Sequence, residues 1–136
     1  MKKEITVLIA DDNKLMQKAL SLLISGTDGL QLAGEARSGE EAIALAKELS
    51  PDIILMDINM SPVNGFEATR KILKHNQSAR IIGLSLHKEP TYAKNMFKMG
   101  AKGYVTKSAA HKEIIDAIMK VAAGGNYIGK DLEGKI

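Results

Sequence analysis

Three acidic side chains follow two apolar runs of this sequence, and they are the residues best placed to do chemistry. Asp57 comes directly after residues 53–56, and Asp11 and Asp12 come directly after residues 5–10. Runs of four or more apolar residues are typical of strands buried on both faces of a parallel sheet. The carboxyl ends of parallel strands meet at one edge of the sheet, where α/β proteins place their chemistry. We therefore expect the three carboxylates to converge.

Three converging carboxylates require a cation, because like charges at short range raise one another's pKa. Mg²⁺ takes oxygen ligands and suits a site with few carboxylates and several waters. A carboxylate beside such an ion can act as a nucleophile toward a phosphoryl group. The pattern predicts a magnesium-assisted phosphoryl acceptor with Asp57 as the nucleophile.

The composition is that of one soluble globular domain. The chain has 136 residues, of which 45% are hydrophobic and 26% are charged, which is enough to bury a core unaided. It has no Cys, so disulfides and thiolate metal sites are excluded. No apolar run approaches the roughly 18 residues of a membrane span, and the first residues do not resemble a signal peptide. We expect a cytoplasmic protein without a membrane partner.

The net charge of +3 is unevenly distributed. Residues 1–69 carry 6 Lys/Arg and 11 Asp/Glu, whereas residues 70–136 carry 13 Lys/Arg and 5 Asp/Glu. A basic second half could meet an acidic partner or nucleic acid. No aromatic residues interleave with the lysines and no Arg cluster occurs, which favours a solvated Lys-rich surface.

Hydrophobic periodicity predicts five strands that alternate with five helices. The expected strands are residues 4–10, 30–36, 53–57, 79–85 and 102–106, and the expected helices are residues 13–25, 38–49, 66–75, 89–99 and 109–123. Ser38 followed by Glu41 has the spacing of a capping box at the second helix. This alternation predicts a parallel sheet covered by helices on both faces. Periodicity is lost after Gly125, so we expect residues 1–125 to form the domain and residues 126–136 a tail or the start of a linker.

Two further polar residues lie at the ends of the predicted fourth and fifth strands, namely Ser85 and Lys107. Together with the three acids, they make the chain resemble the receiver domain of bacterial two-component response regulators. Supporting matches lie at residues 57–65 and 100–107, and the resemblance covers roughly residues 4–125. It implies a flavodoxin-like (βα)5 doubly wound parallel sheet of strand order 2-1-3-4-5, with the pocket at its switch point.

The resemblance implies a role for each acid and its metal. Asp57 would accept a phosphoryl group from the phosphohistidine of a sensor histidine kinase. Asp12 would bind Mg²⁺ directly and Asp11 largely through water, and Asp57 and the backbone carbonyl of Asn59 would complete the ligands from the protein. Phosphoryl transfer depends mainly on positioning and charge stabilisation, which fits this set of residues. The protein would then be no enzyme beyond its own phosphorylation and dephosphorylation.

The resemblance also implies a switch. Lys107 would pair with Asp57 before modification and with a phosphoryl oxygen afterwards, and Ser85 would donate its hydroxyl to another phosphoryl oxygen. Tyr104 would swing inward as Ser85 moves, and the surface formed by residues 89–120 would change with it. This surface could support a homodimer on phosphorylation, although it is rich in lysine.

The histidines are scattered in helix-end or loop contexts, so His75 and His111 are expected to be ordinary surface residues. His87 lies two residues after Ser85, beside the pocket mouth. Asn59 has the same relation to Asp57. We hypothesise that His87 and Asn59 modulate dephosphorylation.

The chain departs from the family pattern at two places. The family usually has Pro four residues after the acceptor Asp, whereas this chain has Ser61 there and Pro62 next. Ser108 stands where many receivers have Pro, so a cis bond after Lys107 is disfavoured by about 3 kcal/mol. The second feature resembles receivers of the NarL/LuxR class, which carry a helix-turn-helix domain after a linker. DNA would be bound only through that domain, which this chain lacks; the alternative is a stand-alone receiver that acts by protein–protein interaction.

The same residues also allow less specific interpretations, and two other functions use similar residues. Asp11 and Asp12 could simply cap the following helix, and Ser85 and Lys107 could be ordinary strand-end and surface residues; their joint placement argues otherwise. A phosphatase of the haloacid-dehalogenase kind needs an acid two residues after the nucleophile, where Asn59 stands. A flavodoxin-type flavin binder would need a phosphate-binding loop after the first strand, where the acids would repel phosphate.

Overall fold

The computed structural model describes residues 4–135 as a six-stranded parallel sheet flanked by helices. The strand order is β2-β1-β3-β4-β5-β6, so the predicted order 2-1-3-4-5 is confirmed and one strand is added at the edge. The elements are β1 (Ile5–Ala10), α1 (Lys14–Ser25), β2 (Leu30–Ala36), α2 (Gly39–Leu49), β3 (Ile53–Asp57), α3 (Gly65–His75), β4 (Ile81–Ser85), α4 (Pro90–Met99), β5 (Gly103–Thr106), α5 (His111–Ala122), β6 (Tyr127–Ile128) and a 3₁₀ turn, η1 (Lys130–Leu132).

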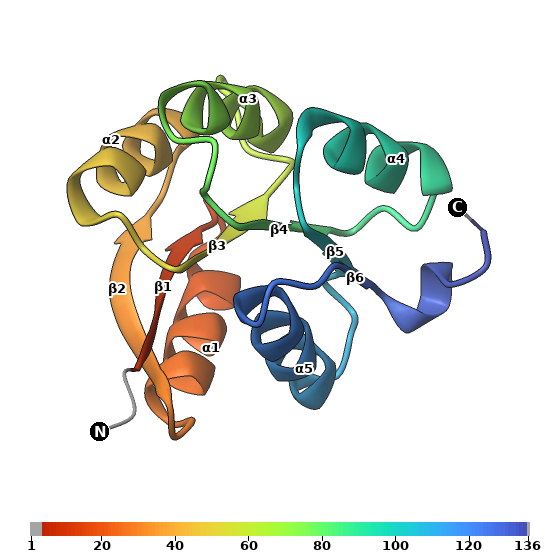
Figure 1. Ribbon diagram of the computed structural model, residues 1–136, viewed down its shortest axis with the longest axis horizontal. Coiled ribbons are helices and arrows are strands. Elements are labelled where there is room, and N and C mark those ends of the chain that lie inside the picture. Colours follow the sequence, from red (N-terminus) through yellow and green to blue (C-terminus); the bar gives the residue numbers. More distant parts are fainter. Residues whose placement is uncertain (1–3, 136) are drawn as a thin grey trace.

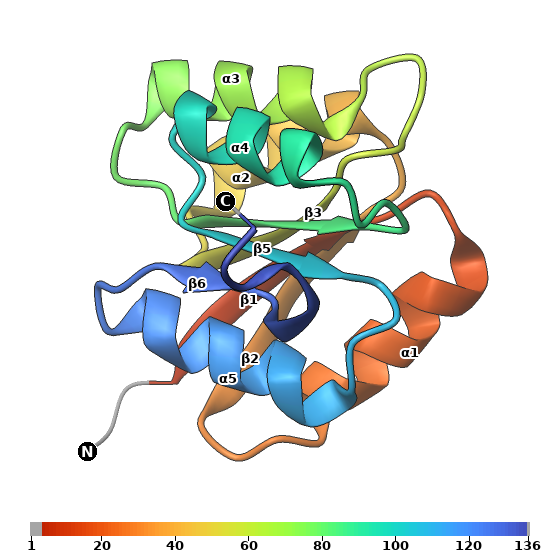
Figure 2. The same cartoon turned by 90° about the vertical axis from the view of Figure 1, so that its right-hand side faces the viewer.

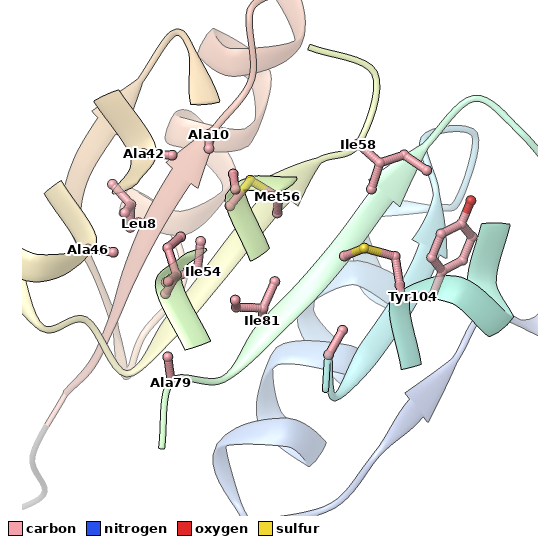
Figure 3. Close-up of a cluster of buried hydrophobic side chains, with 14 of the residues drawn as sticks. Leu8, Ala10, Ala42, Ala46, Ile54, Met56, Ile58, Ala79, Ile81 and Tyr104 are labelled. Atoms are coloured by element: carbon pink, nitrogen blue, oxygen red, sulfur yellow. The ribbon is translucent and has the colours of Figure 1, made fainter. Parts of the chain in front are cut away.

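The helices cover both faces of the sheet. Helices α2, α3 and α4 lie on one face, and α1 and α5 lie on the other (Figures 1 and 2). Because alternate residues of a strand point to opposite faces, Leu8 and Ile54 enter the core under α2, α3 and α4, as Figure 3 shows, whereas Val7 and Ile53 enter the core against α1 and α5. Strands buried on both faces therefore read as continuous apolar runs.

Local capping residues set the helix boundaries. Asn13 caps α1 with its side chain, which accepts a hydrogen bond from the Met16 N–H, so the cap is neither of the preceding acids. Ser38 accepts from the Glu41 N–H at the start of α2, as predicted. Capping by Asn or Ser satisfies a backbone donor that has no partner within the helix. The acids before α1, Asp11 and Asp12, therefore do not cap the helix and lie at the carboxyl edge of the sheet.

The chain after Gly125 differs from the expected tail. Tyr127 and Ile128 form β6, which pairs in parallel with Gly103 and Tyr104 of β5, and Leu132 in η1 is fully buried. A two-residue strand followed by one turn is too short to produce a periodic pattern, so the sequence did not reveal it. Where the domain ends and a linker begins stays a prediction.

The peptide-bond geometry and the helix lengths can be compared with the sequence-based predictions. Within residues 4–135, the only cis peptide bond is Ser61–Pro62, and the bond after Lys107 is therefore trans, as expected. No helix in the same range is both long enough and apolar enough to cross a bilayer.

Candidate functional site

The three predicted acids converge at the carboxyl ends of two neighbouring strands. β1 and β3 pair in parallel with Ala10 opposite Met56, so the next residues, Asp11 and Asp57, emerge side by side. Both are buried at 1% exposure, whereas Asp12 is exposed. One carboxylate oxygen from each of the three lies within 4.8 Å of the others. The convergence expected from the sequence is therefore present.

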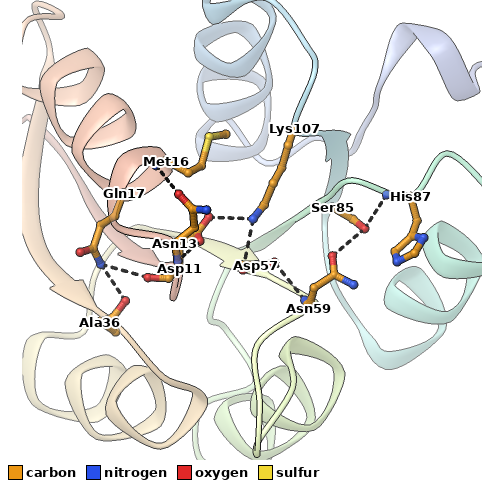
Figure 4. Close-up of polar contacts among 10 residues, drawn as sticks. All are labelled: Asp11, Asn13, Met16, Gln17, Ala36, Asp57, Asn59, Ser85, His87 and Lys107. Atoms are coloured by element: carbon orange, nitrogen blue, oxygen red, sulfur yellow. Dashed lines mark hydrogen bonds and ion pairs between the residues drawn. The ribbon is translucent and has the colours of Figure 1, made fainter.

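Lys107 holds two of these carboxylates together, as Figure 4 shows. Its Nζ lies 3.2 Å from Asp57 Oδ2 and 3.0 Å from Asp11 Oδ2, and its side chain is 10% exposed. The Lys107 N–H donates to the Ser85 carbonyl at 2.7 Å, so the end of β4 sets the start of the loop that carries the ammonium. The pairing with Asp57 was predicted; the slightly shorter pairing with Asp11 was not.

Burial dominates the electrostatics of Asp57. Loss of water around its carboxyl raises the pKa, and the negative charge of Asp11 raises it further. The Asn59 N–H, 2.9 Å from Asp57 Oδ1, and the Lys107 ammonium act in the opposite direction. The rise from burial prevails, so the ionised carboxylate is held at a cost that a further cation would reduce.

The donor set fits Mg²⁺. Three carboxylate oxygens within 4.8 Å of one another offer hard oxygen ligands of the kind that this ion prefers. Asp11 Oδ2 is buried and accepts no hydrogen bond within residues 4–135; the group that faces it is the Lys107 ammonium. Since Asp12 is exposed, the site keeps an open side for waters or a phosphoryl group.

Ser85 and Asn59 meet across the pocket from the ends of β4 and β3. The Ser85 hydroxyl donates to Asn59 Oδ1 at 3.1 Å and accepts from the His87 N–H at 2.9 Å. Ser85 is fully buried at the end of β4. Its hydroxyl is thus held beside the acids but has an exchangeable partner, the side-chain amide of an exposed residue.

His87 and Tyr104 are joined through the loop after β4. The His87 ring stacks on Tyr92 with centroids 4.4 Å apart and planes 15° apart, so it is half-buried and more constrained than a freely solvated histidine. Tyr104 is fully buried, and its hydroxyl donates to the His87 carbonyl at 3.2 Å. Burial raises the pKa of Tyr104, so the phenol keeps this donor.

Sequence reasoning missed Gln17, a buried polar residue of α1. Its Nε2 donates to the Ala36 carbonyl at 2.8 Å and approaches the Asp11 carbonyl at 3.4 Å, which ties α1 to the ends of β1 and β2. The signal was available, because Gln17 is a polar residue in line with Leu20 and Ile24 on the buried face of the helix.

An apolar depression borders Lys107. It has a volume of about 300 Å³ and is lined by Asn13, Leu15, Met16, Ala19, Leu86 and Lys107. Leu15 and Leu86 are 80% and 72% exposed, which is unusual for leucine side chains. Apolar surface of this kind beside a polar site is a feature of surfaces that bind other proteins.

This fold and site together define a class of protein. A doubly wound parallel sheet that gathers three acids, a lysine and a hydroxyl at its switch point is the arrangement of a signalling receiver. The sequence profile of the response regulator receiver domain matches residues 7–119, so the chain belongs to this family.

The chain is similar to two response regulators of known name. The chain is 38% identical over 128 residues to the response regulator GacA of Pseudomonas viridiflava, covering 94% of this chain and 60% of GacA. It is 35% identical to the response regulator UvrY of Escherichia coli strain K12, covering 94% of this chain and 59% of UvrY. The chain therefore spans about 60% of the length of these relatives.

Solved structures of response regulators have the same fold as this chain. A two-component response regulator of the LuxR family from Aurantimonas sp. SI85-9A1 superposes with a TM-score of 0.92 at 32% identity, covering 96% of this chain and 93% of that one. The signal receiver domain of NarL from Mycobacterium tuberculosis gives a TM-score of 0.86 at 26% identity, covering 90% and 98%. The predicted likeness to the NarL/LuxR class is confirmed.

Proposed function

We propose that Asp57 accepts a phosphoryl group from a phosphohistidine on a sensor histidine kinase, with Mg²⁺ bound beside it. The observation that carries the proposal is the contact of one lysine ammonium with two buried carboxylates, Asp11 at 3.0 Å and Asp57 at 3.2 Å, at the switch point of the sheet. In the transfer, an Asp57 oxygen forms a bond to phosphorus as the phosphorus–nitrogen bond of the donor breaks. The electron pair of that bond leaves with the imidazole nitrogen.

Each surrounding residue has a part that its position supports. Asp11, Asp12 and Asp57 would hold Mg²⁺, together with the predicted backbone carbonyl of Asn59, and the ion would neutralise charge on the phosphoryl oxygens. Lys107 already bridges Asp11 and Asp57, so it needs only a small movement to reach a phosphoryl oxygen. Such fixed positive charges are the main source of catalysis in phosphoryl transfer.

The switch would begin at Ser85. Its hydroxyl exchanges the Asn59 amide for a phosphoryl oxygen, and the His87 N–H follows the hydroxyl because it donates to the same oxygen. The His87 carbonyl in turn holds Tyr104, which passes the movement to the surface formed by residues 89–120. A homodimer formed through that surface on phosphorylation is part of this proposal.

The partner and the output follow from the surface and from the relatives. The exposed Leu15 and Leu86 beside Lys107 give a kinase an apolar area on which to dock over the pocket. Because the similar structure from Aurantimonas is of the LuxR family and the curated relatives are longer, we infer that this receiver controls a LuxR-type DNA-binding domain. A stand-alone receiver that acts through protein contacts is the alternative. The cytoplasmic location stays a prediction.

The decisive experiment is intact mass after incubation with acetyl phosphate and Mg²⁺. We expect a gain of one phosphoryl group in the parent chain, none in Asp57→Ala, and an undiminished gain in the matched control Asp28→Ala, which removes an exposed loop carboxylate. A gain that persists in Asp57→Ala would place the acceptor elsewhere. Continuous release of phosphate from small phosphoesters would favour the phosphatase alternative, and a bound yellow chromophore the flavin one.

The lifetime of the phosphorylated form tests the two modulating residues. The Asn59 side chain contacts the Ser85 hydroxyl, and the half-buried His87 side chain extends from a residue whose backbone N–H donates to the same hydroxyl. Both side chains therefore stand close to the group that would contact the phosphoryl oxygen. We expect Asn59→Ala and His87→Ala to change the rate of dephosphorylation. Unchanged lifetimes in both variants would remove this part of the proposal.

A further inference from the structure

The last described segment is docked along strand β5. We refer to residues 127–132, which comprise β6 and η1, as the strap. The Tyr127 N–H donates to the Lys102 carbonyl at 2.9 Å, and the Gly129 N–H donates to the Tyr104 carbonyl at 2.8 Å. Figure 2 shows the strap running beside β5, with the chain turning toward α4 after η1. It therefore covers the edge of the strand that carries Tyr104 and leads to Lys107.

Side chains anchor the strap to both layers of the domain. On the α5 side, Tyr127 packs against the core and its hydroxyl donates to Glu113 Oε2 at 2.8 Å; the same oxygen accepts from the Lys130 N–H at 2.7 Å. On the α4 side, Leu132 is fully buried in the same cluster as Tyr104. The strap thus crosses the sheet edge and fastens one layer to the other.

Two contacts lead from the strap toward the phosphoryl site. The Thr106 hydroxyl donates to Asp131 Oδ2 at 2.8 Å, and Thr106 is the buried residue directly before Lys107. Leu132 shares its cluster with Tyr104, whose hydroxyl holds the loop after Ser85. Neither contact is used by the chemistry at Asp57.

We propose that Asp131 and Leu132 are positioning residues for the phosphoryl site, which act through Thr106 and Tyr104. This inference rests on the proposed function. Tyr104 is buried in the same cluster that buries Leu132, so a Tyr104 ring turned outward would open the cluster and expose Leu132 to water. The docked strap and an occupied phosphoryl site therefore stabilise the same arrangement of β5. Any coupling of this kind is reciprocal by thermodynamic necessity.

The first arm of the test is the affinity for beryllofluoride, a phosphoryl mimic, in the presence of Mg²⁺, measured by calorimetry on the full chain. We expect Leu132→Ala and Asp131→Ala to weaken binding by roughly fivefold or more, the lower end of ordinary coupling between sites. Asp131→Ala removes the oxygen that accepts from the Thr106 hydroxyl. Glu133→Ala is the matched control, because Glu133 is an exposed acid next to the strap; its affinity should stay within about twofold of the parent value. Asp131→Ala carries the test if Leu132→Ala fails to fold, since it truncates an exposed side chain.

The second arm of the test is hydrogen exchange of the strap amides. If the strap were merely structural, binding of beryllofluoride would not change the exchange rates of these amides. We expect beryllofluoride to slow exchange of the Tyr127 and Gly129 amides in the parent chain. Because the coupling is reciprocal, the fold-change in exchange rate should equal the fold-change in beryllofluoride affinity that undocking of the strap causes. Faster strap exchange in Leu132→Ala with unchanged beryllofluoride affinity would overturn the proposal. A parent chain that binds no beryllofluoride would instead overturn the proposed function, and the inference would fall with it.

Discussion

Replacement of Lys107 by Met tests whether one ammonium holds the acidic cluster together. Met keeps most of the aliphatic stem and removes the charge. With an effective dielectric constant of about 20, charges at 3.0 and 3.2 Å attract by about 5 kcal/mol each, and carboxylates within 4.8 Å of each other repel by about 3 kcal/mol. Desolvation offsets much of the attraction in the parent chain, but removal of one partner leaves the repulsion uncompensated.

We therefore expect Lys107→Met to lower the free energy of unfolding by about 3 kcal/mol at neutral pH without Mg²⁺. The assay is urea denaturation. We expect the variant to bind Mg²⁺ more tightly than the parent chain, because it lacks the Lys107 ammonium that competes with Mg²⁺ for the carboxylates. The loss of unfolding free energy should therefore become smaller as Mg²⁺ is added. The loss should also shrink as the pH falls, since protonation of Asp57 removes the repulsion.

A double-mutant cycle decides whether this reasoning holds. In the Asp57→Asn background the same Lys107→Met change should cost about 1 kcal/mol, because only Asp11 remains to be neutralised. Equal losses in both backgrounds, within about 0.5 kcal/mol, would refute the account. The control Lys112→Met removes an exposed lysine of α5 and should change stability by less than about 0.5 kcal/mol.

Three further outcomes follow from the site. Burial raises the pKa of Asp57 above its usual 3.8, so the folded parent chain gains stability as the pH falls through the raised pKa of the folded state. Asp57→Asn should therefore be more stable than the parent at neutral pH without Mg²⁺. Urea denaturation over a pH series should show this difference disappearing toward pH 3.8. Mg²⁺ at ten times its dissociation constant should stabilise the parent by about 1.4 kcal/mol, and thermal melts with and without a chelator should show a clearly smaller gain in Asp12→Asn. Gly65→Ala should cost about 1–3 kcal/mol in a denaturation experiment, because the added Cβ would lie 2.4 Å from Ile58 Cα and 2.5 Å from the Asp57 carbonyl oxygen. A tolerated Gly65→Ala would contradict the close approach of α3 to the end of β3.

Most of the sheet was predictable because its strands bury both faces. The runs at 7–10 and 53–56 are uninterrupted apolar residues, and Ser38 marked the start of α2 through a local spacing. Boundaries moved by one or two residues, as at β4, which begins at Ile81 rather than at residue 79. Such shifts are expected where strand ends depend on pairing with a neighbour rather than on propensity.

The candidate site was predictable to the extent that strand ends define it. Asp57 and Ser85 are the last residues of β3 and β4, Asp11 and Lys107 directly follow β1 and β5, and parallel topology alone brings strand ends to one edge. The roles of these residues as nucleophile, metal ligand and switch stay predictions that the proposed experiments address. Tyr104 is fully buried in the structure, and its inward movement on activation stays a prediction.

By itself, the sequence determined the order of strands and helices and the set of acids that reach the sheet edge, because hydrophobic period and parallel connection are properties of the chain read along its length. Only the tertiary structure decided that Lys107 contacts Asp11 as well as Asp57, that Ser85 meets Asn59, and that Leu132 enters the core. These contacts join residues far apart in the sequence or depend on side-chain rotamers. Neither leaves a periodic signal, since each depends on how the packed layers meet in space.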